Sequence, residues 1–549
     1  MTMILTMPAL RRTALAFAVA LSLPFALAAC GKSETDADRA VRDGILLTGN
    51  GVEPKTLDPQ LNTGSPDGRI ISVLSEGLVT QDPVDPFGVR PGMASSWEHS
   101  DDFRQWTFHI RPEAKWSDGT PLTANDFLYS YERILSPAFG AELAELFYGI
   151  ANAEAFNKGT VTDFAQVGIK APDPQTLVIT ADAPMPYLLN MLATYTFYPV
   201  QKAAVEANGK MLDRDNAWFE KGKYVGNGPF ILKEWKTNQY IEVARNPNYW
   251  DAANLKLNGI RFFAIENQKS ELNAFLSGQL HMTNVGSVPV ERIASLKESH
   301  PDEVRTDRQP NANYYEFNVT RAPFKDARVR RALSLALDRK LLTERVMLGG
   351  EIPLGGIVPG GLPGYEAMPA PAPDPGRARK LLAEAGYPGG KGFPKSEILI
   401  NTRESNRKLA EAIQAMWKRE LGIDVGIYNQ EWKVFLDTRT AKNFDIARAG
   451  WYGFYPGPGA YLTLMTSSSP NNDAGWANPT FDALVARALA TGDAAQRNAL
   501  FRQAEQILAS ELPILPLFTG AQTTLVDTRV QNWGANGAGN FKFVSLEAK

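Results

Sequence analysis

"SEILINTRESNRKLAEAIQAMWKRELGIDVGIYN", residues 396–429, holds a strand pattern, a helix pattern and a second strand pattern in direct succession. The strands are expected at 396–402 and 423–429, and the helix at 406–421. Such a unit crosses over right-handed and places its two strands parallel in one sheet. The stretch therefore predicts an α/β fold, in which ligands tend to lie near the strand ends.

Strand and helix patterns alternate through the rest of the 549 residues, a length that favours two to four domains. Residues 81–199 resemble an α+β unit, with a strand at 104–110 and a following helix for which Thr123 is the expected N-cap. Three strand patterns and a helix between 200 and 305 predict a mixed sheet.

The region from 324 to 348 predicts one long helix with Asp326 as its cap. The core-facing residues of that helix are Val329, Leu333, Ala336 and Leu337. A Gly/Pro-rich loop follows at 349–376, and loops of this length tend to be functional or covering elements. The strand-like stretch 513–533 has no partner nearby in sequence and is expected to pair with a distant sheet.

The first 29 residues are predicted to be a secretory signal peptide, because two arginines precede an apolar run that is too short to span a bilayer. "LAAC" (27–30) resembles a bacterial lipobox, which makes Cys30 the expected site of lipidation and 30–45 a lipidated tether. The alternative is a plain signal peptide with Cys30 near the cut. Cys30 is the single cysteine, so disulfides are excluded.

Composition argues against several classes of function. The formal charge of -3 and the lack of a basic stripe argue against nucleic acid. Four scattered histidines predict no metal site, and no nucleophile elbow or phosphate loop is present, so we expect neither a cofactor nor enzymatic activity.

A recognition surface is predicted in the last third of the chain, where aromatic residues gather near two arginines. Its members are Trp432, Trp451, Tyr452, Phe454, Tyr455, Arg439 and Arg448. The alternative is that the aromatics form core and that an arginine beside Asp445 makes a structural ion pair. These residue types alone leave a secreted binding protein and an enzyme both open.

Motifs spread over nearly the whole mature chain resemble one family. They are "EPKTLDP" (53–59), "SEGLV" (75–79), "AKWSDGTPLTANDF" (114–127), "GNGPFIL" (226–232), "RNPNYW" (245–250), "DARVRRALSLALDR" (326–339), "NQEWKVFLDTR" (429–439) and "FDIARAGW" (444–451). The family is the oligopeptide/dipeptide-binding class of extracellular solute-binding proteins of ABC importers. The resemblance implies a periplasmic-binding-protein-like α/β fold of the large, three-domain class II type.

In that fold two lobes close on the ligand by a hinge. The resemblance implies a discontinuous domain I with a mixed sheet (46–80, 200–305 and 522–549), domain II (81–199) and domain III (306–521), with ligand between domains I and III. It also implies a monomer in the periplasm or cell envelope, held to the membrane only by its lipid anchor. Its partners would be a peptide, an ABC permease and the ATPase subunits of that permease.

The resemblance also implies ligand-binding residues. Gly450 and Tyr452 would make main-chain bonds to an extended peptide, and Trp432, Trp451 and Tyr314 would form pocket walls. The peptide carboxylate would meet three arginines, and Asn406 stands where the family has a histidine that serves longer peptides. These arginines are Arg448, Arg439 and Arg321.

Phe454 departs from the family pattern, because it stands where an aspartate pairs with the free amine of the peptide. A phenyl ring does not neutralise an ammonium, and losing one partner of an enclosed ion pair costs about 3 to 5 kcal/mol. A solute that is N-blocked, cell-wall-derived or not a peptide is therefore the alternative ligand on the same fold.

Overall fold

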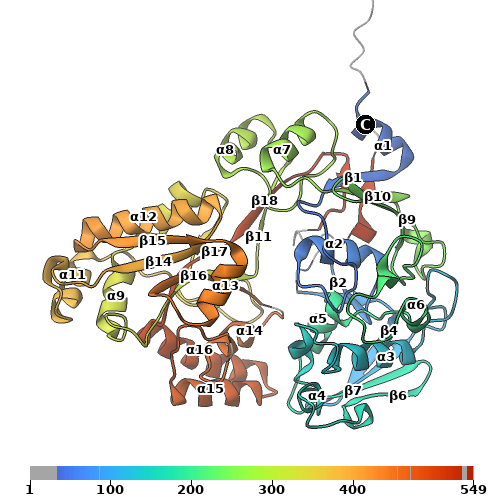
Figure 1. Ribbon diagram of the computed structural model, residues 1–549, viewed down its shortest axis with the longest axis horizontal. Coiled ribbons are helices and arrows are strands. Elements are labelled where there is room, and N and C mark those ends of the chain that lie inside the picture. Colours follow the sequence, from blue (N-terminus) through green and yellow to red (C-terminus); the bar gives the residue numbers. More distant parts are fainter. Residues whose placement is uncertain are drawn as a thin grey trace, which may run out of the picture.

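The computed structural model describes residues 34–547 except 84, 86, 454, 470 and 535–540, and it leaves out the side chains of 404, 432 and 433. Figure 1 shows two lobes side by side, with the helices α7 and α8 above the junction between them. The cleft between the lobes is where the cavities described below lie.

The first lobe contains a four-stranded sheet whose order is β1-β10-β9-β8. Its strands are β1 (Ile45–Gly49), β8 (Phe230–Lys236), β9 (Tyr240–Arg245) and β10 (Gly259–Phe263). β1 runs parallel to β10 while the other neighbours are antiparallel, which confirms the predicted mixed sheet. The accompanying helices are α1 (Asp36–Asp43), α2 (Ser65–Leu74), α7 (Gln268–Leu276) and α8 (Val290–Ser299).

Part of the expected tether is instead the helix α1. Thr35 and Asp38 form a capping box, and Gly44 ends the helix in the left-handed conformation. Ala37 and Ala40 are buried, and His281 Nε2 bonds the carbonyl of Ala37 at 3.0 Å. The polar composition of 34–45 concealed this helix because only its two alanines are buried.

The lower part of the same lobe is an α+β unit around an antiparallel sheet of order β4-β5-β7-β6. Its strands are β4 (Ala94–His99), β5 (Gln105–Ile110), β6 (Ile169–Asp173) and β7 (Thr176–Thr180), with the short pair β2 (Val79–Gln81) and β3 (Val89–Pro91) nearby. Its helices are α3 (Ala124–Leu135), α4 (Ala153–Asn157), α5 (Leu188–Leu192) and α6 (Lys202–Ala207). Thr123 caps α3 as predicted.

The second lobe contains a six-stranded sheet of order β13-β17-β12-β16-β14-β15. Its strands are β12 (Asn311–Phe317), β13 (Ile352–Pro353), β14 (Ser396–Asn401), β15 (Val425–Gln430), β16 (Ile446–Tyr452) and β17 (Ile514–Thr519). β14 and β15 are parallel and flank the helix α12 (Glu404–Leu421) in sequence, so the opening strand-helix-strand prediction is confirmed.

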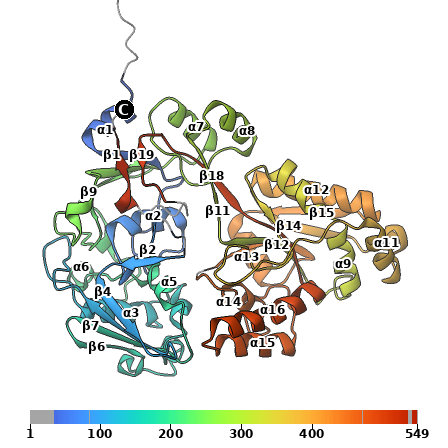
Figure 2. The same cartoon turned by 180° about the vertical axis from the view of Figure 1, so that it is seen from behind.

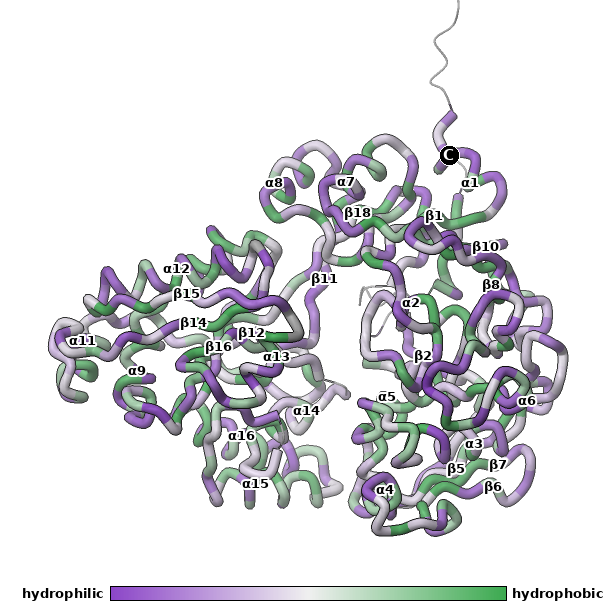
Figure 3. Tube along the Cα trace, viewed as in Figure 1, coloured by the Kyte–Doolittle hydropathy of each residue, from purple (hydrophilic) through white to green (hydrophobic). Residues whose placement is uncertain are grey.

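Helices cover both faces of this sheet and form two separate cores. One core contains α9 (Ala327–Leu335), α11 (Pro375–Glu384) and α12, and the other contains α14 (Gly459–Leu462), α15 (Pro479–Leu489) and α16 (Ala494–Glu511). A further helix, α13 (Trp432–Thr440), contacts β14. Figure 3 shows hydrophobic stretches along the inner strands of both lobes, as around β12 and β7.

The long helix predicted at 324–348 is interrupted. α9 ends at Leu335, and α10 (Arg339–Leu341) restarts because the side chain of Asp338 accepts the amide of Leu341. A π-helical segment follows from Leu342 to Met347. The cap at Asp326 and the four predicted core residues are confirmed.

Two strands connect the lobes: β11 (Val304–Arg308) and β18 (Ala521–Leu525) pair antiparallel from Val304 opposite Leu525 to Arg308 opposite Ala521. Figure 2 shows them crossing between the two bodies. β17 pairs with β12, so the distant pairing predicted for 513–533 is confirmed. The remaining short pair is β19 (Val530–Gln531) with β20 (Ser545–Leu546).

Candidate ligand-binding cleft

A cavity of about 640 Å³ lies between the two lobes. One wall comes from the first lobe, around 51–52, 265–268 and 284–293, and the other from the second lobe. The second wall uses the start of β12, the start of α12, the end of β16 and the turn between β17 and β18. Ligand cavities of this size suit small molecules and short peptides.

The end of β16 has an open backbone edge beside this cavity. On one side residues 446–452 pair with β12, where Gly450 lies opposite Asn313 and Tyr452 opposite Asn311. On the other side β14 pairs only with Ile446 and Ala447, and no described strand continues that pairing over 448–452. An extended chain has room there to add as a strand.

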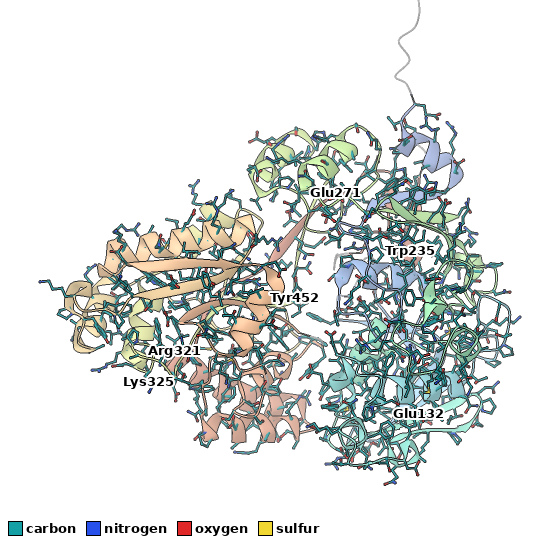
Figure 4. All side chains as sticks on the ribbon, viewed as in Figure 1. Glu132, Trp235, Glu271, Arg321, Lys325 and Tyr452 are labelled. Atoms are coloured by element: carbon teal, nitrogen blue, oxygen red, sulfur yellow. The ribbon has the colours of Figure 1, made fainter. Side chains whose placement is uncertain are left out.

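The aromatic residues expected near the ligand differ in how much of each side chain is exposed. Tyr452 is 48% exposed and faces the gap between the lobes (Figure 4). Trp451 borders the cavity while its indole Nε1 donates to the Ala460 carbonyl at 2.7 Å. Tyr314 also borders the cavity but is almost fully buried in the core around α14–α16.

Arg448 borders the cavity and has no described carboxylate within 4.0 Å of its guanidinium. Within the described residues, its guanidinium makes one long hydrogen bond, in which Nη2 donates to Asn313 Oδ1 at 3.5 Å. Burial, together with the charges of Arg403 and Arg439, lowers the pKa of Arg448. A partly buried guanidinium without a described counter-ion favours an anionic ligand group.

Arg439, by contrast, is already compensated. Its Nε lies 2.7 Å from Asp473 Oδ2 and 3.5 Å from Glu316 Oε2, and both carboxylates are buried. Burial raises the pKa of Glu316 to about 7, against the opposing effect of Arg439. Arg439 does not border either cavity, and its ion pairs are with Asp473 and Glu316 rather than with Asp445.

Arg321 lies away from both cavities (Figure 4). Its guanidinium contacts Asn443 Oδ1 at 3.1 Å and Asp445 Oδ1 at 3.9 Å. The reason is topological: the cavity borders the first residues of β12, and Arg321 follows the opposite end of that strand.

Asn406 is buried at the start of α12, borders the cavity, and donates from Nδ2 to Asn401 Oδ1 at 2.9 Å. Cys30, Phe454 and the side chain of Trp432 lie outside the part of the chain that the structure describes. Gly450 borders the cavity, and a Cβ there would lie 3.4 Å from the Ala312 carbonyl oxygen.

Sequence reasoning missed Arg403, which precedes α12 and borders the cavity near Arg448. A charged residue at a predicted strand end was the available signal. It also missed a second cavity of about 370 Å³, formed by α2, the 193–195 turn, Gln309 and Tyr452. The two cavities share Asn284, Val285, Tyr452 and Gln522.

Two further features are not found in the residues that the structure describes. No helix among them combines the length and apolarity needed to cross a bilayer. No three histidine, cysteine, aspartate or glutamate side chains gather there in a way that would hold a metal ion.

Two α/β lobes joined by two crossing strands, with a polar cavity between them, define the periplasmic-binding-protein fold of solute-binding proteins. The family model for bacterial extracellular solute-binding proteins, family 5, matches residues 88–473. The chain belongs to this family, as its motifs predicted.

Individual relatives agree with that assignment. The chain is 38% identical to the periplasmic oligopeptide-binding protein OppA of Salmonella typhimurium, with 88% of each chain covered. It is 37% identical to the periplasmic murein peptide-binding protein MppA of Escherichia coli, covering 88% of this chain and 89% of MppA. The Haemophilus influenzae OppA complex with RPPGFSPFR superposes with a TM-score of 0.79 at 34% identity, covering 92% and 99%.

Proposed function

We propose that this protein captures peptides outside the cytoplasm and delivers them to the permease of an ABC importer. The observation that carries the proposal is the open edge of β16 next to the uncompensated guanidinium of Arg448. The edge offers main-chain hydrogen bonds to any extended peptide, and the guanidinium offers a bidentate partner for its C-terminal carboxylate. The names of OppA and MppA, an oligopeptide binder and a murein peptide binder, support a peptide ligand.

The proposed ligand contacts divide by chemistry. Gly450 and Tyr452 would bond the peptide main chain. Trp451 and Tyr314, which border the roomy cavity, would contact the peptide side chains, and the family resemblance assigns the same role to Trp432. Arg448 would hold the carboxylate directly. Arg439 would support it from behind, because its own charge is committed to Asp473 and Glu316.

Enclosure of the ligand would come from a hinge at β11 and β18. We propose domain I as 46–80, 200–305 and 522–549, domain II as 81–199, and domain III as 306–521. In support of this division, the two crossing strands pair across the proposed boundaries at 305/306 and 521/522. Closure would bury the ligand between domains I and III and signal occupancy to the permease.

The protein would reach the periplasm by its signal peptide and stay at the membrane as a monomer through lipid on Cys30. Globomycin, an inhibitor of lipoprotein signal cleavage, would leave the precursor uncleaved. A Cys30→Ser variant that still labels with radioactive palmitate would contradict lipidation at this residue. No turnover is expected, since the relatives carry the names of binding proteins.

A second candidate rests on Phe454, which replaces the expected amine partner. On this alternative the preferred solute is N-blocked, derived from cell wall, or not a peptide. Phe454→Asp would then shift preference from N-acetylated toward free-amine peptides. An unchanged preference would count against this candidate.

The test of the proposed function is incubation with a mixed peptide pool, followed by native and denaturing mass spectrometry. Intact bound peptides are expected, and the same peptides should be depleted in an Arg448→Met variant. Cleaved peptides would indicate a hydrolase. If the pool yields no complex while the purified protein carries another molecule, peptide capture is contradicted.

A further inference from the structure

The smaller cavity of the cleft has an unusual charge pattern. Sixteen described residues border it, and Arg69 is the only charged one among these sixteen. The carboxylates that border the cleft, Glu266 and Glu351, belong to the larger cavity alone. An ammonium group entering the smaller cavity would therefore meet a cation and no described carboxylate.

Arg69 is held in place but not neutralised. Its Nη1 donates to Asn50 Oδ1 at 2.8 Å, and no described carboxylate lies within 4.0 Å of its guanidinium. Burial lowers the pKa of Arg69 to about 10, and Glu271 only partly opposes this effect. Since ordinary pH values lie well below 10, the side chain remains charged.

Two carboxylates in this part of the first lobe, Glu271 and Asp67, accept hydrogen bonds from other groups. Glu271 (Figure 4) accepts the amide of Asn284 at 2.8 Å and the hydroxyl of Ser287. Asp67 accepts the amides of Lys55 and Thr56 at 2.7 and 2.9 Å. Neither of these acids borders the cavity.

Two buried polar atoms on residues that border the cavity have no hydrogen-bond partner within the described part of the chain: the Gln309 Nε2 donor and the Asn284 Oδ1 acceptor, and Asn284 also borders the larger cavity. Gln309 is 9% exposed, and its Nε2 lacks a partner among the described residues, so it is free to donate to a ligand. Gly68, one residue before Arg69, lets the Tyr195 ring approach α2, since a Cβ at 68 would lie 2.4 Å from Tyr195 Cε1. A donor amide and a guanidinium therefore line a recess walled by an aromatic ring.

The position of this recess relates it to Arg448. Tyr452 borders both cavities and follows Arg448 by four residues of β16, roughly 13 Å at 3.3 Å per strand residue. A peptide of about three or four residues that adds to β16 with its carboxylate at Arg448 would direct its other end toward Arg69.

We infer that the recess at Arg69 and Gln309 is a second anion-binding subsite, so that the preferred ligand is a short peptide whose amino end carries an acidic blocking group. This inference rests on the proposed peptide capture and specifies its substrate class. A carboxylate or phosphate on the amino end would satisfy the guanidinium and the free amide together.

The test compares one tetrapeptide in three forms by isothermal titration calorimetry: with a free amine, N-acetylated and N-succinylated. The succinyl form is expected to bind roughly 10- to 100-fold more tightly than the acetyl form, the effect of one hydrogen bond to a charged group. The free-amine form should bind most weakly. Equal affinity of succinyl and acetyl peptides, or a preference for the free amine, would overturn the second subsite.

Substitutions of Arg69 test whether this residue causes the preference for the succinyl peptide. Arg69→Gln should abolish the preference for succinyl over acetyl, whereas Arg69→Lys should retain part of it. Arg487→Gln, on the exposed side of α15, is the matched control that should keep the full preference. A succinyl preference that survives in Arg69→Gln would overturn the assignment to Arg69.

The outcomes separate the two proposals. If the peptides bind but the succinyl group adds nothing, peptide capture stands and the subsite is wrong. If none of the three forms binds, peptide capture fails, and the subsite argued from it fails as well.

Discussion

Tyr187 of the first lobe and Tyr455 of the second stack on each other, with ring centroids 4.0 Å apart and planes inclined by 13°. Tyr187 precedes α5 in the first lobe, and Tyr455 follows β16 in the second. The lobes therefore touch at a point separate from the connecting strands β11 and β18. This contact favours the arrangement in which the cavity is enclosed.

Removing either ring should weaken ligand retention. An aromatic pair contributes about 0.5 to 1.5 kcal/mol, so Tyr187→Ala and Tyr455→Ala are each expected to raise the dissociation rate roughly 2- to 10-fold. Stopped-flow fluorescence with a peptide from the pool measures this rate. The double variant should match the singles, because the rings act as a pair.

The control for this prediction is Tyr428→Ala, since Tyr428 is exposed on β15 and borders neither cavity. Dissociation from that variant should equal the wild-type rate. Fully additive effects of Tyr187→Ala and Tyr455→Ala would contradict a shared contact.

Arg448→Met should weaken peptides that carry a free C-terminal carboxylate by about 2 to 5 kcal/mol, because the ligand charge loses its enclosed partner. Calorimetry with a peptide and its C-terminal amide separates this effect from packing, since the amide should lose little affinity. Arg321→Met is the control, because Arg321 lies outside both cavities. A large loss with Arg321→Met and none with Arg448→Met would reverse the assignment.

Arg439→Met should reduce stability rather than act first on the ligand. Glu316 and Asp473 would remain buried without their counter-ion, a change that costs about 3 to 5 kcal/mol. The midpoint of urea unfolding measures the loss. Arg448→Met removes a guanidinium without a described carboxylate partner and should leave that midpoint nearly unchanged. Equal shifts of the midpoint in the two variants would contradict the different roles assigned to the two arginines.

Glu316 should make stability depend on pH. Burial raises its pKa from 4.5 to about 7, so the folded protein binds more protons than the unfolded chain between these values. The stabilisation is complete below pH 4.5 and is lost as pH rises through 7. The free energy of unfolding of Glu316→Gln, relative to that of wild type, should therefore increase by up to about 3 kcal/mol from pH 5 to pH 8.

Urea unfolding of wild type and Glu316→Gln at pH 5 and at pH 8 measures the direction of this change in stability. The control is Glu344→Gln, since Glu344 is exposed beside Lys340 and should show no such gain. A gain for Glu316→Gln at pH 5 that disappears at pH 8 would mean that the direction of the pKa shift is wrong.

The sequence by itself determined the elements and their local boundaries. Strand alternation, helical spacing and the caps at Thr123 and Asp326 are short-range properties, because each depends on neighbours within about one turn. The strand-helix-strand unit at 396–429 therefore predicted a parallel pair that the structure contains. The α1 helix was missed because its two buried alanines are a weak signal in a polar stretch.

Tertiary structure alone decided which arginine side chains are free to pair with a ligand. Arg439 and Arg448 have the same side chain and lie nine residues apart, yet one is compensated by Asp473 and Glu316 while the other has no described carboxylate nearby. Arg69, far away in sequence, borders a cavity that shares Tyr452 with the cavity beside Arg448. The free energy of a charge depends on the solvent and the partners around it, and the folded chain brings these together from distant segments.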